Sequence, residues 1–141
     1  MPYKSPKVYT LNIRAIHLID EIRISTDYFF GNAGLAWSTS ANLAKIWIPK
    51  SGTIRAVQAW FYAMGSGTAE DVIVVIRKNN TTDYAFLATL HLNAASVLGS
   101  SYTLNIPVAA GDYIEFKVTT PAWVTNPTAI STSGNVLIEC D

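Results

Sequence analysis

The residues that most often carry enzymatic chemistry are few and widely separated in this chain of 141 residues. The two histidines, His17 and His91, each lie among aliphatic neighbours, a pattern typical of half-buried structural histidines. A Ser–His–Asp triad can assemble from distant residues, so spacing alone leaves such a site open. The sequence contains no G-x-S-x-G nucleophile elbow, however. We therefore expect no catalytic residues and predict that the protein is not an enzyme.

Metal-binding residues are equally scattered. Cys140 is the only cysteine, so the chain can form neither an internal disulfide nor a Cys/His zinc cluster. We expect it to be a small apolar residue that ends a strand, rather than a reactive thiol. The adjacent carboxylates Asp20 and Glu21 would point to opposite faces of a strand, which is wrong for a shared metal. We predict no metal site and no cofactor.

Two further function classes are disfavoured by glycine and charge patterns. Residues 65–68 form a Gly-Ser-Gly-Thr segment without the Lys-Ser/Thr of a phosphate-binding loop, and we interpret them as a hairpin turn. Ten basic and ten acidic residues give zero net charge, which disfavours electrostatic binding of nucleic acid. No stretch approaches the roughly 18 apolar residues of a membrane span.

Exposed aromatic rings could instead bind a sugar by stacking. Trp123, with Asn126 beside it, lies in a loop-like stretch over residues 119–127, the best single candidate for a binding tip. The alternative is a tryptophan folded back onto the end of the domain, which would leave no ring for a ligand.

Apolar residues recur with a period of two along most of the chain, which is typical of strands. Strands are therefore the elements that must position these residues. Turn-forming residues recur between the strands, and this spacing favours an all-β antiparallel sandwich with a jelly-roll arrangement over βαβ units. A helix is expected only within residues 41–46. The clearest predicted strands cover residues 54–62, 72–78, 86–92, 102–106, 113–119 and 135–140.

The N-terminal region differs from the rest by its local basic bias. We predict an extended arm over residues 1–20 and a jelly-roll domain over residues 21–141. The arm could contact a neighbouring subunit or a shell, and the alternative is a frayed terminus. The candidate contact residues of the arm are Lys4, Lys7, Tyr9 and Arg14.

The middle of the chain carries a recognisable pattern. An apolar strand and tight turn over residues 47–54 precede a strand that runs into an asparagine turn at 70–80. A turn that leads into a late strand follows at residues 108–118, with the sequence Val-Ala-Ala-Gly-Asp-Tyr-Ile-Glu-Phe-Lys-Val. Together these resemble the compact jelly roll of the complement globular head and tumour necrosis factor families, in particular the versions on tailed-phage virions. The resemblance covers roughly residues 45–140 and implies no catalytic residues.

The resemblance also implies a function. Proteins of this fold are typically tight trimers, and in phages they serve as capsid decoration proteins or fibre heads. We therefore expect a trimeric capsid decoration (cement) protein on the virion surface, bound to the major capsid protein of the same virus. The alternative is a receptor- or carbohydrate-binding head domain of a phage fibre. The lack of a collagen-like stalk argues against an extracellular signalling role.

The low charge fits a trimer. Only 14% of the residues are charged, against about 25% in a usual soluble domain. Burial of one sheet against other copies would replace ordinary charged surface with an apolar interface. Each candidate could equally be core within one subunit. The predicted interface residues are Trp47, Trp60, Tyr62, Tyr113 and Phe116.

Overall fold

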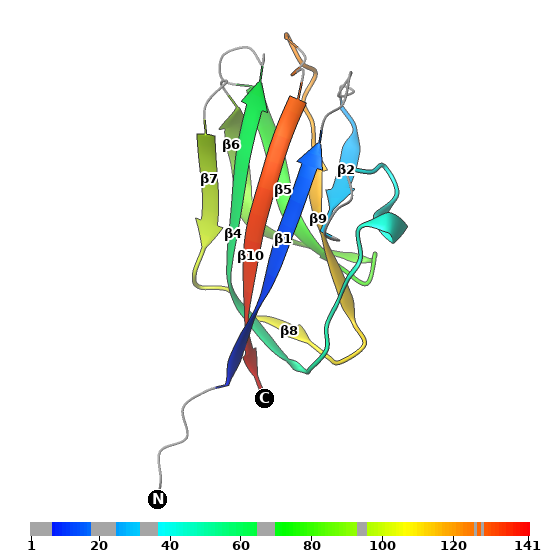
Figure 1. The fold of residues 1–141 in the computed structure, drawn as a ribbon, viewed down its shortest axis with the longest axis vertical. Helices are drawn as coiled ribbons and strands as arrows, with labels where there is room; N and C mark the ends of the chain where they lie inside the picture. Colours follow the sequence, from blue (N-terminus) through cyan, green and yellow to red (C-terminus); the bar gives the residue numbers. More distant parts are fainter. Residues whose placement is uncertain are drawn as a thin grey trace, which may run out of the picture.

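Two antiparallel sheets, A and B, pack face to face in the computed structural model (Figure 1), which describes residues 7–17, 25–31, 37–64, 70–92, 96–125, 127 and 129–141. Sheet A contains β1 (Val8–His17), β10 (Ala129–Cys140), β4 (Gly52–Met64), β7 (Ser96–Ser101) and β8 (Ile106–Val108). Sheet B contains β2 (Asp27–Phe30), β9 (Tyr113–Thr119), β5 (Glu70–Lys78), β6 (Thr82–Leu92) and β3 (Ile46–Trp47).

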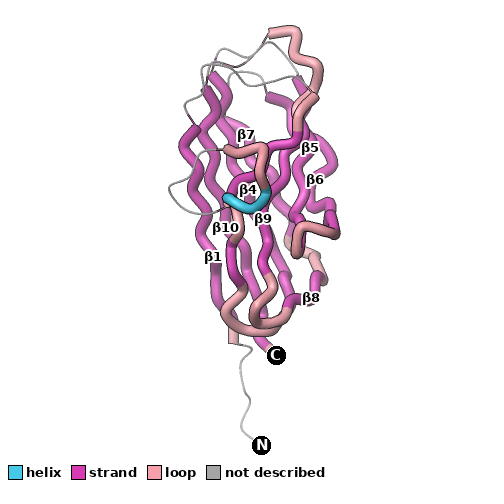
Figure 2. Tube along the Cα trace, turned by 90° about the vertical axis from the view of Figure 1, so that its right-hand side faces the viewer, coloured by secondary structure: helices cyan, strands magenta, loops and turns pink. Residues whose placement is uncertain are grey.

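The strand order is that of a jelly roll. Sheet A runs β1-β10-β4-β7 and sheet B runs β2-β9-β5-β6, with β8 paired to β4 and β3 paired to β9. The predicted antiparallel sandwich is confirmed. A short 3-10 helix, η1 (Ala41–Leu43), falls where the sequence allowed a helix, and Figure 2 shows it in the foreground. Among the described residues, no helix has the length and hydrophobicity needed to cross a membrane.

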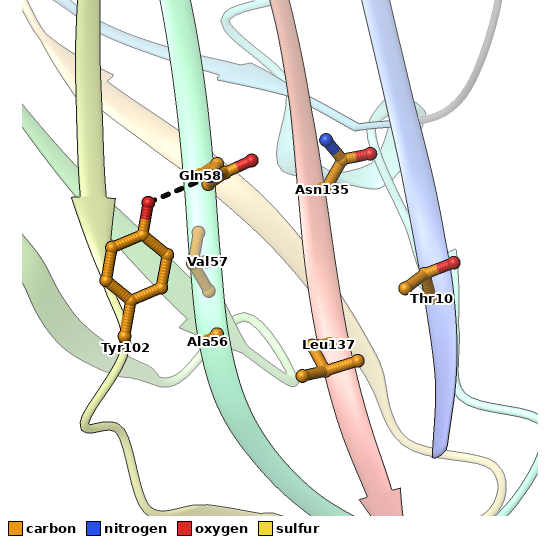
Figure 3. A pocket seen from close by; sticks show the side chains of 7 residues that line it. All are labelled: Thr10, Ala56, Val57, Gln58, Tyr102, Asn135 and Leu137. Atoms are coloured by element: carbon orange, nitrogen blue, oxygen red, sulfur yellow. Dashed lines mark hydrogen bonds between the residues drawn. The ribbon is translucent and has the colours of Figure 1, made fainter.

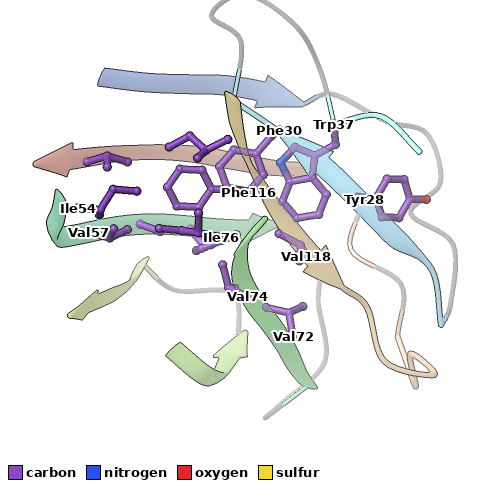
Figure 4. Close-up of a cluster of buried hydrophobic side chains, with 14 of the residues drawn as sticks. Tyr28, Phe30, Trp37, Ile54, Val57, Val72, Val74, Ile76, Phe116 and Val118 are labelled. Carbon is purple, nitrogen blue, oxygen red and sulfur yellow. The ribbon is translucent and has the colours of Figure 1, made fainter. Parts of the chain in front are cut away.

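The core between the sheets is built by alternate residues of each strand (Figure 4). Phe30 stacks between Phe116, at 5.0 Å between ring centroids, and Trp37, at 5.8 Å. Phe61 packs edge-on against both Phe30 and Trp37. The indole Nε1 of Trp37 donates a hydrogen bond to Thr132 Oγ1 at 3.2 Å, so this polar atom is paired inside the core.

A bulge in β4 explains one wrong strand prediction. Residues 102–106 were expected to form a strand; instead β7 extends through Ser101 and β8 begins at Ile106. The register between β10 and β4 shifts at Arg55, which has no partner in β10. β7 pairs with β4 beyond this bulge and β8 pairs before it, so the chain between them makes only one backbone bond, from Leu104 N to Arg55 O.

The predicted hairpin turn at residues 65–68 lies outside the described residues. The strands before and after it, β4 and β5, belong to different sheets and do not pair with each other. By contrast, Asn79 and Asn80 do form the turn between β5 and β6, with the positive φ angles that asparagine tolerates.

The structure moves the boundary predicted at residue 20, because half of the expected arm is a strand of the sandwich. Each residue of β1, from Val8 to His17, pairs in register with β10. Just before β1, Lys7 O accepts a hydrogen bond from Cys140 N at 2.7 Å. The sandwich therefore begins at Val8, and any arm is confined to the residues before it.

Candidate interaction surface

The outer face of sheet A presents a broad surface whose described side chains carry no charge except an ion pair at one end. It is formed where β1, β10, β4 and β7 turn their outward residues away from the core (Figure 1). Cross-strand partners in an antiparallel sheet share a face, so the register groups these residues together. We call this surface the sheet A face: Thr10, Ala56, Gln58, Trp60, Tyr62, Leu98, Ser100, Tyr102, Ser131, Ser133, Asn135 and Leu137.

Two aromatic rings occupy the middle of β4 on this face. Trp60 and Tyr62 are two residues apart, which places them on the same side of the strand. Their rings stack with centroids 6.4 Å apart and planes within 11° of each other. Both side chains are partly exposed. The pair forms a flat apolar plate next to Leu98, the exposed cross-strand partner of Trp60.

A groove of about 270 Å³ opens on the same face, towards the bulge (Figure 3). Tyr102 closes one side of it, and Gln58 Nε2 donates a hydrogen bond to the Tyr102 hydroxyl at 2.9 Å. Hydrogen bonding to Ser100 and to Gln58 lowers the pKa of Tyr102. The groove is lined by Thr10, Ala56, Val57, Gln58, Tyr102, Asn135 and Leu137.

A single ion pair marks the end of the sheet A face. Arg55 Nη2 lies 3.5 Å from Glu139 Oε1, and Arg55 Nη1 also donates to Asn105 Oδ1 at 2.6 Å. Both charged side chains are partly exposed and lie beyond the groove, at the bulge. Their charges compensate each other, so the surface next to the groove also has little net charge.

The outer face of sheet B carries an ion network instead. Lys117 Nζ lies 2.9 Å from Asp83 Oδ2 and 3.7 Å from Asp27 Oδ2. Arg77 Nη1 adds a third contact, 3.5 Å from Asp83 Oδ1. Among the described side chains, the sheet A face is therefore uncharged up to the Arg55–Glu139 pair at its end, whereas the outer face of sheet B carries an ion network.

The structure separates the predicted interface residues into three places. Trp60 and Tyr62 lie on the sheet A face, whereas Trp47 and Tyr113 lie on paired strands of sheet B. Trp47 is 59% exposed, its ring packs edge-on against Tyr113 at 5.2 Å, and Lys45 Nζ lies 4.4 Å from the Tyr113 ring centroid. Phe116 is 0% exposed. Its assignment to an interface is corrected, because alternation along β9 turns it into the core.

The predicted ligand-binding loop is corrected as well. Trp123 is only 8% exposed and belongs to the main core cluster, so its ring is folded back onto the sandwich. An indole with that burial offers no free face for stacking on a sugar. Asn126 lies outside the described residues.

The four residues of the predicted arm have different environments. Lys7 is exposed, whereas Tyr9 is half-buried and its hydroxyl donates to Lys50 O at 2.8 Å. Arg14 lies in β1, paired in register with Ser133, and its side chain is outside the described set. Lys4 is outside the described residues. Tyr9 is thus tied into the sandwich.

The groove residues Gln58, Tyr102, Asn135 and Leu137 were missed from the sequence. Alternation does place Gln58 on the same side of its strand as Trp60, which is a usable signal. Tyr102, Asn135 and Leu137 come next to Gln58 only through the bulge and the pairing of β4 with β10. Neither of these features can be recognised in the sequence. In the described part of the chain, no three histidine, cysteine or acidic side chains come close enough to hold a metal ion.

Comparison with known proteins identifies a fold likeness. No protein-family model matches the chain, and no curated protein sequence matches it. A chain of infectious bursal disease virus, Gx strain, superposes with a TM-score of 0.51 and 16% identity, covering 97% of this chain and 32% of the viral one. This chain thus spans about a third of the length of that viral chain. The Eiger TNF of S. frugiperda superposes with a TM-score of 0.49 and 12% identity, covering 97% of this chain and 94% of that one. The likeness to the viral chain shows a shared fold.

Proposed function

We propose that this chain is a non-enzymatic structural protein of a virion, which assembles through the sheet A face as a homotrimer and decorates a capsid shell. The observation that carries the proposal is the lack of charge among the described side chains of this face, with its Trp60–Tyr62 plate and groove, set against the ion network on sheet B. Large obligate interfaces resemble a protein core cut in half, and they are depleted in charge.

The size of the surface supports this reading. A monomer of 15.4 kDa is expected to expose about 7,200 Å². The chain exposes 7470 Å², so its surface is of ordinary extent and simply carries few charges. Soluble monomers rarely expose apolar patches beyond about 300–600 Å². Coverage by other copies of the chain would remove the sheet A face from water.

The fold likeness to a chain of a virus agrees with a role in a virion. We propose the capsid surface as the location, the major capsid protein of the same virus as the partner, and the residues before β1 as the contact. Lys4 and the exposed Lys7 would give this short arm its positive charge.

Sedimentation with empty capsids tests the decoration role. The full chain should pellet with capsids, and a chain lacking residues 1–6 should remain a folded oligomer that stays in the supernatant. Removal of these residues leaves β1 and its pairing with β10 complete. If the full chain fails to pellet with the capsid of its own virus, the decoration role is wrong. If the shortened chain pellets equally well, the arm is not the contact.

Carbohydrate binding is a second candidate, and the groove favours it over the Trp123 loop. Asn135 and the Gln58–Tyr102 pair offer polar groups beside the apolar Leu137 and Ala56, a combination that suits sugar hydroxyls and ring faces. A fibre-head domain would use such a groove to bind a receptor. A glycan array probed with the wild-type chain and with Asn135→Ala separates this function from self-assembly, because only sugar binding needs the exposed amide.

A further inference from the structure

Glu115 on β9 is a buried carboxyl group that the proposed assembly does not use. It has no exposed surface, and neither of its carboxylate oxygens has a hydrogen-bond partner. Burial of an ionised carboxylate in this state is very costly, because the lost hydration is not replaced. The observed arrangement is therefore the arrangement of the protonated, neutral group.

The charged groups around Glu115 come from every strand beside it. Its cross-strand partner on β5 is Arg77, whose guanidinium reaches across β9 to lie 5.9 Å from the Phe29 ring on β2. Arg77 is engaged through its two terminal nitrogens, with Asp83 at 3.5 Å and with Asn80 O at 3.0 Å, whereas its buried Nε has no hydrogen-bond partner. Two residues away on the same face of β9, Lys117 is compensated by Asp83 and by Asp27.

The remaining neighbour is Lys45, which belongs to the segment that covers this side of sheet B. Lys45 Nζ lies over the Tyr113 ring, two residues from Glu115 on β9, at 4.4 Å from the centroid. We call residues 37–48 the cover segment. Ala41 and Ala44 of this segment form a small buried cluster with Phe29, separate from the main core. The cluster and the position of Lys45 place the cover segment beside Glu115.

The cover segment is anchored at its two ends, where Trp37 and Ile48 belong to the main core and β3 pairs with β9, and fewer described contacts hold its middle, residues 38–45. The backbones of Phe29 and Ser38 exchange hydrogen bonds at 2.7 and 2.9 Å, and Ile48 N donates to Asp112 O at 2.8 Å. Between these anchors lie η1 and the two-residue strand β3. A small buried cluster with two end anchors is an element that can open locally without unfolding the sandwich.

We propose that Glu115 is a protonation latch: the neutral carboxyl allows the cover segment to close over the outer face of sheet B, and loss of its proton opens the segment. Opening would admit water to the carboxylate and allow Arg77 to pair with it. It would also release the edge-on contact between Trp47 and Tyr113, and so change an exposed aromatic patch on this side of the molecule.

The raised pKa of Glu115 agrees with a segment that is closed at low pH and opens as the pH rises. Burial raises the pKa of Glu115 to about 7, against the smaller opposing effect of Arg77 and Lys45, and Asp83 adds slightly to the rise. A carboxyl whose pKa is raised in the closed form stabilises that form at low pH. This stabilisation is complete below the ordinary glutamate pKa and is lost as the pH rises through about 7. Between these two pKa values each pH unit should change the closed-to-open ratio by up to about tenfold, and above about pH 7 the ratio should level off.

Amide hydrogen exchange of the full chain between pH 3.5 and 9 tests the latch. After correction for intrinsic chemistry, the rates at Leu43 and Ala44, whose amides bond to Ser40 O and Ala41 O, should be flat below about pH 4. Between about pH 4.3 and 7 they should rise by up to about tenfold per unit, and above about pH 7 they should level off. Glu115→Gln, which is neutral at every pH, should abolish this rise, and Glu139→Gln, at an exposed carboxylate, should keep it.

A flat wild-type profile, or an unchanged rise in Glu115→Gln, would overturn the proposal. Should the glutamine variant fail to fold, the carboxyl ¹³C shift of Glu115 in the wild-type protein decides the matter. A titration midpoint of the Glu115 carboxyl near pH 7, where the exchange rates at Leu43 and Ala44 also stop rising, supports the latch. A midpoint in the ordinary glutamate range, near 4.3, contradicts it.

Discussion

At the scale of single residues, alternation along a strand decides whether an aromatic ring is core or surface. Phe116 and Tyr113 lie on the same strand, three residues apart, and only Tyr113 reaches the surface. The sequence showed that β9 alternates, but the choice of inward face depends on the packing of sheet A against sheet B. The same ambiguity applied to Trp123, whose burial was the weighed alternative to a binding role.

Replacement of Phe116 by alanine should therefore lower the stability of the subunit itself. The phenyl ring stacks on Phe30 at 5.0 Å and is completely buried, so its removal leaves a cavity. We expect a loss of about 3–5 kcal/mol in the free energy of unfolding, measured by urea denaturation. Trp47→Ala, at an exposed ring, should cost less than about 1 kcal/mol. Similar losses in the two variants would contradict the assignment of Phe116 to the core.

Thr132→Val tests the hydrogen bond from Trp37 Nε1 to Thr132 Oγ1 within the aromatic cluster. The substitution keeps the shape of the side chain but removes the acceptor for Trp37 Nε1. An indole N–H left without that acceptor in the core should cost about 1–3 kcal/mol of unfolding free energy. The matched control is Thr10→Val, an exposed β1 position, which should be nearly neutral. A neutral Thr132→Val would mean that the indole finds another acceptor.

At the scale of elements, the sequence predicted the strands of the sandwich better than the connections between them. The alternation of residue types with a period of two is a local property of the sequence. Five of the six clearest predicted strands accordingly lie within β4, β5, β6, β9 and β10. The bulge at Arg55 and the placement of β4 and β5 in different sheets depend on which strands pair, and pairing is not a local property. For the same reason, residues 8–17 were assigned to an arm rather than to an edge strand of sheet A.

Truncation at the N-terminus separates β1 from the arm. Removal of residues 1–6 should leave the thermal midpoint nearly unchanged. Removal of residues 1–15 should lower it and promote aggregation, because most of β1 is lost and the edge of β10 is exposed. Thermal unfolding and light scattering measure the two effects. Equal midpoints for the two truncated chains would contradict a structural role for β1.

At the scale of the whole molecule, charge is segregated between the two sheets. The composition indicated a deficit of charged residues, and the structure locates that deficit on the sheet A face. Trp60 and Tyr62 could be nominated from the sequence because they are large, apolar and near each other. Their neighbours across β10 and β7, such as Asn135 and Leu98, could not, because they join the surface only through the sheet register.

The molar mass of the purified protein in solution tests self-assembly through the sheet A face most directly. Leu98 and Ile73 form a matched pair, because both are exposed aliphatic residues on strands, 59% and 49% exposed, on sheets A and B respectively. A glutamate buried without a partner in an interface costs about 3–5 kcal/mol, which weakens association by at least about 100-fold. We therefore predict a mass near three chains for the wild type and for Ile73→Glu, and a mass near the 15.4 kDa of one chain for Leu98→Glu. A monomeric wild type, or a Leu98→Glu variant that remains as large as the wild type, would contradict the account.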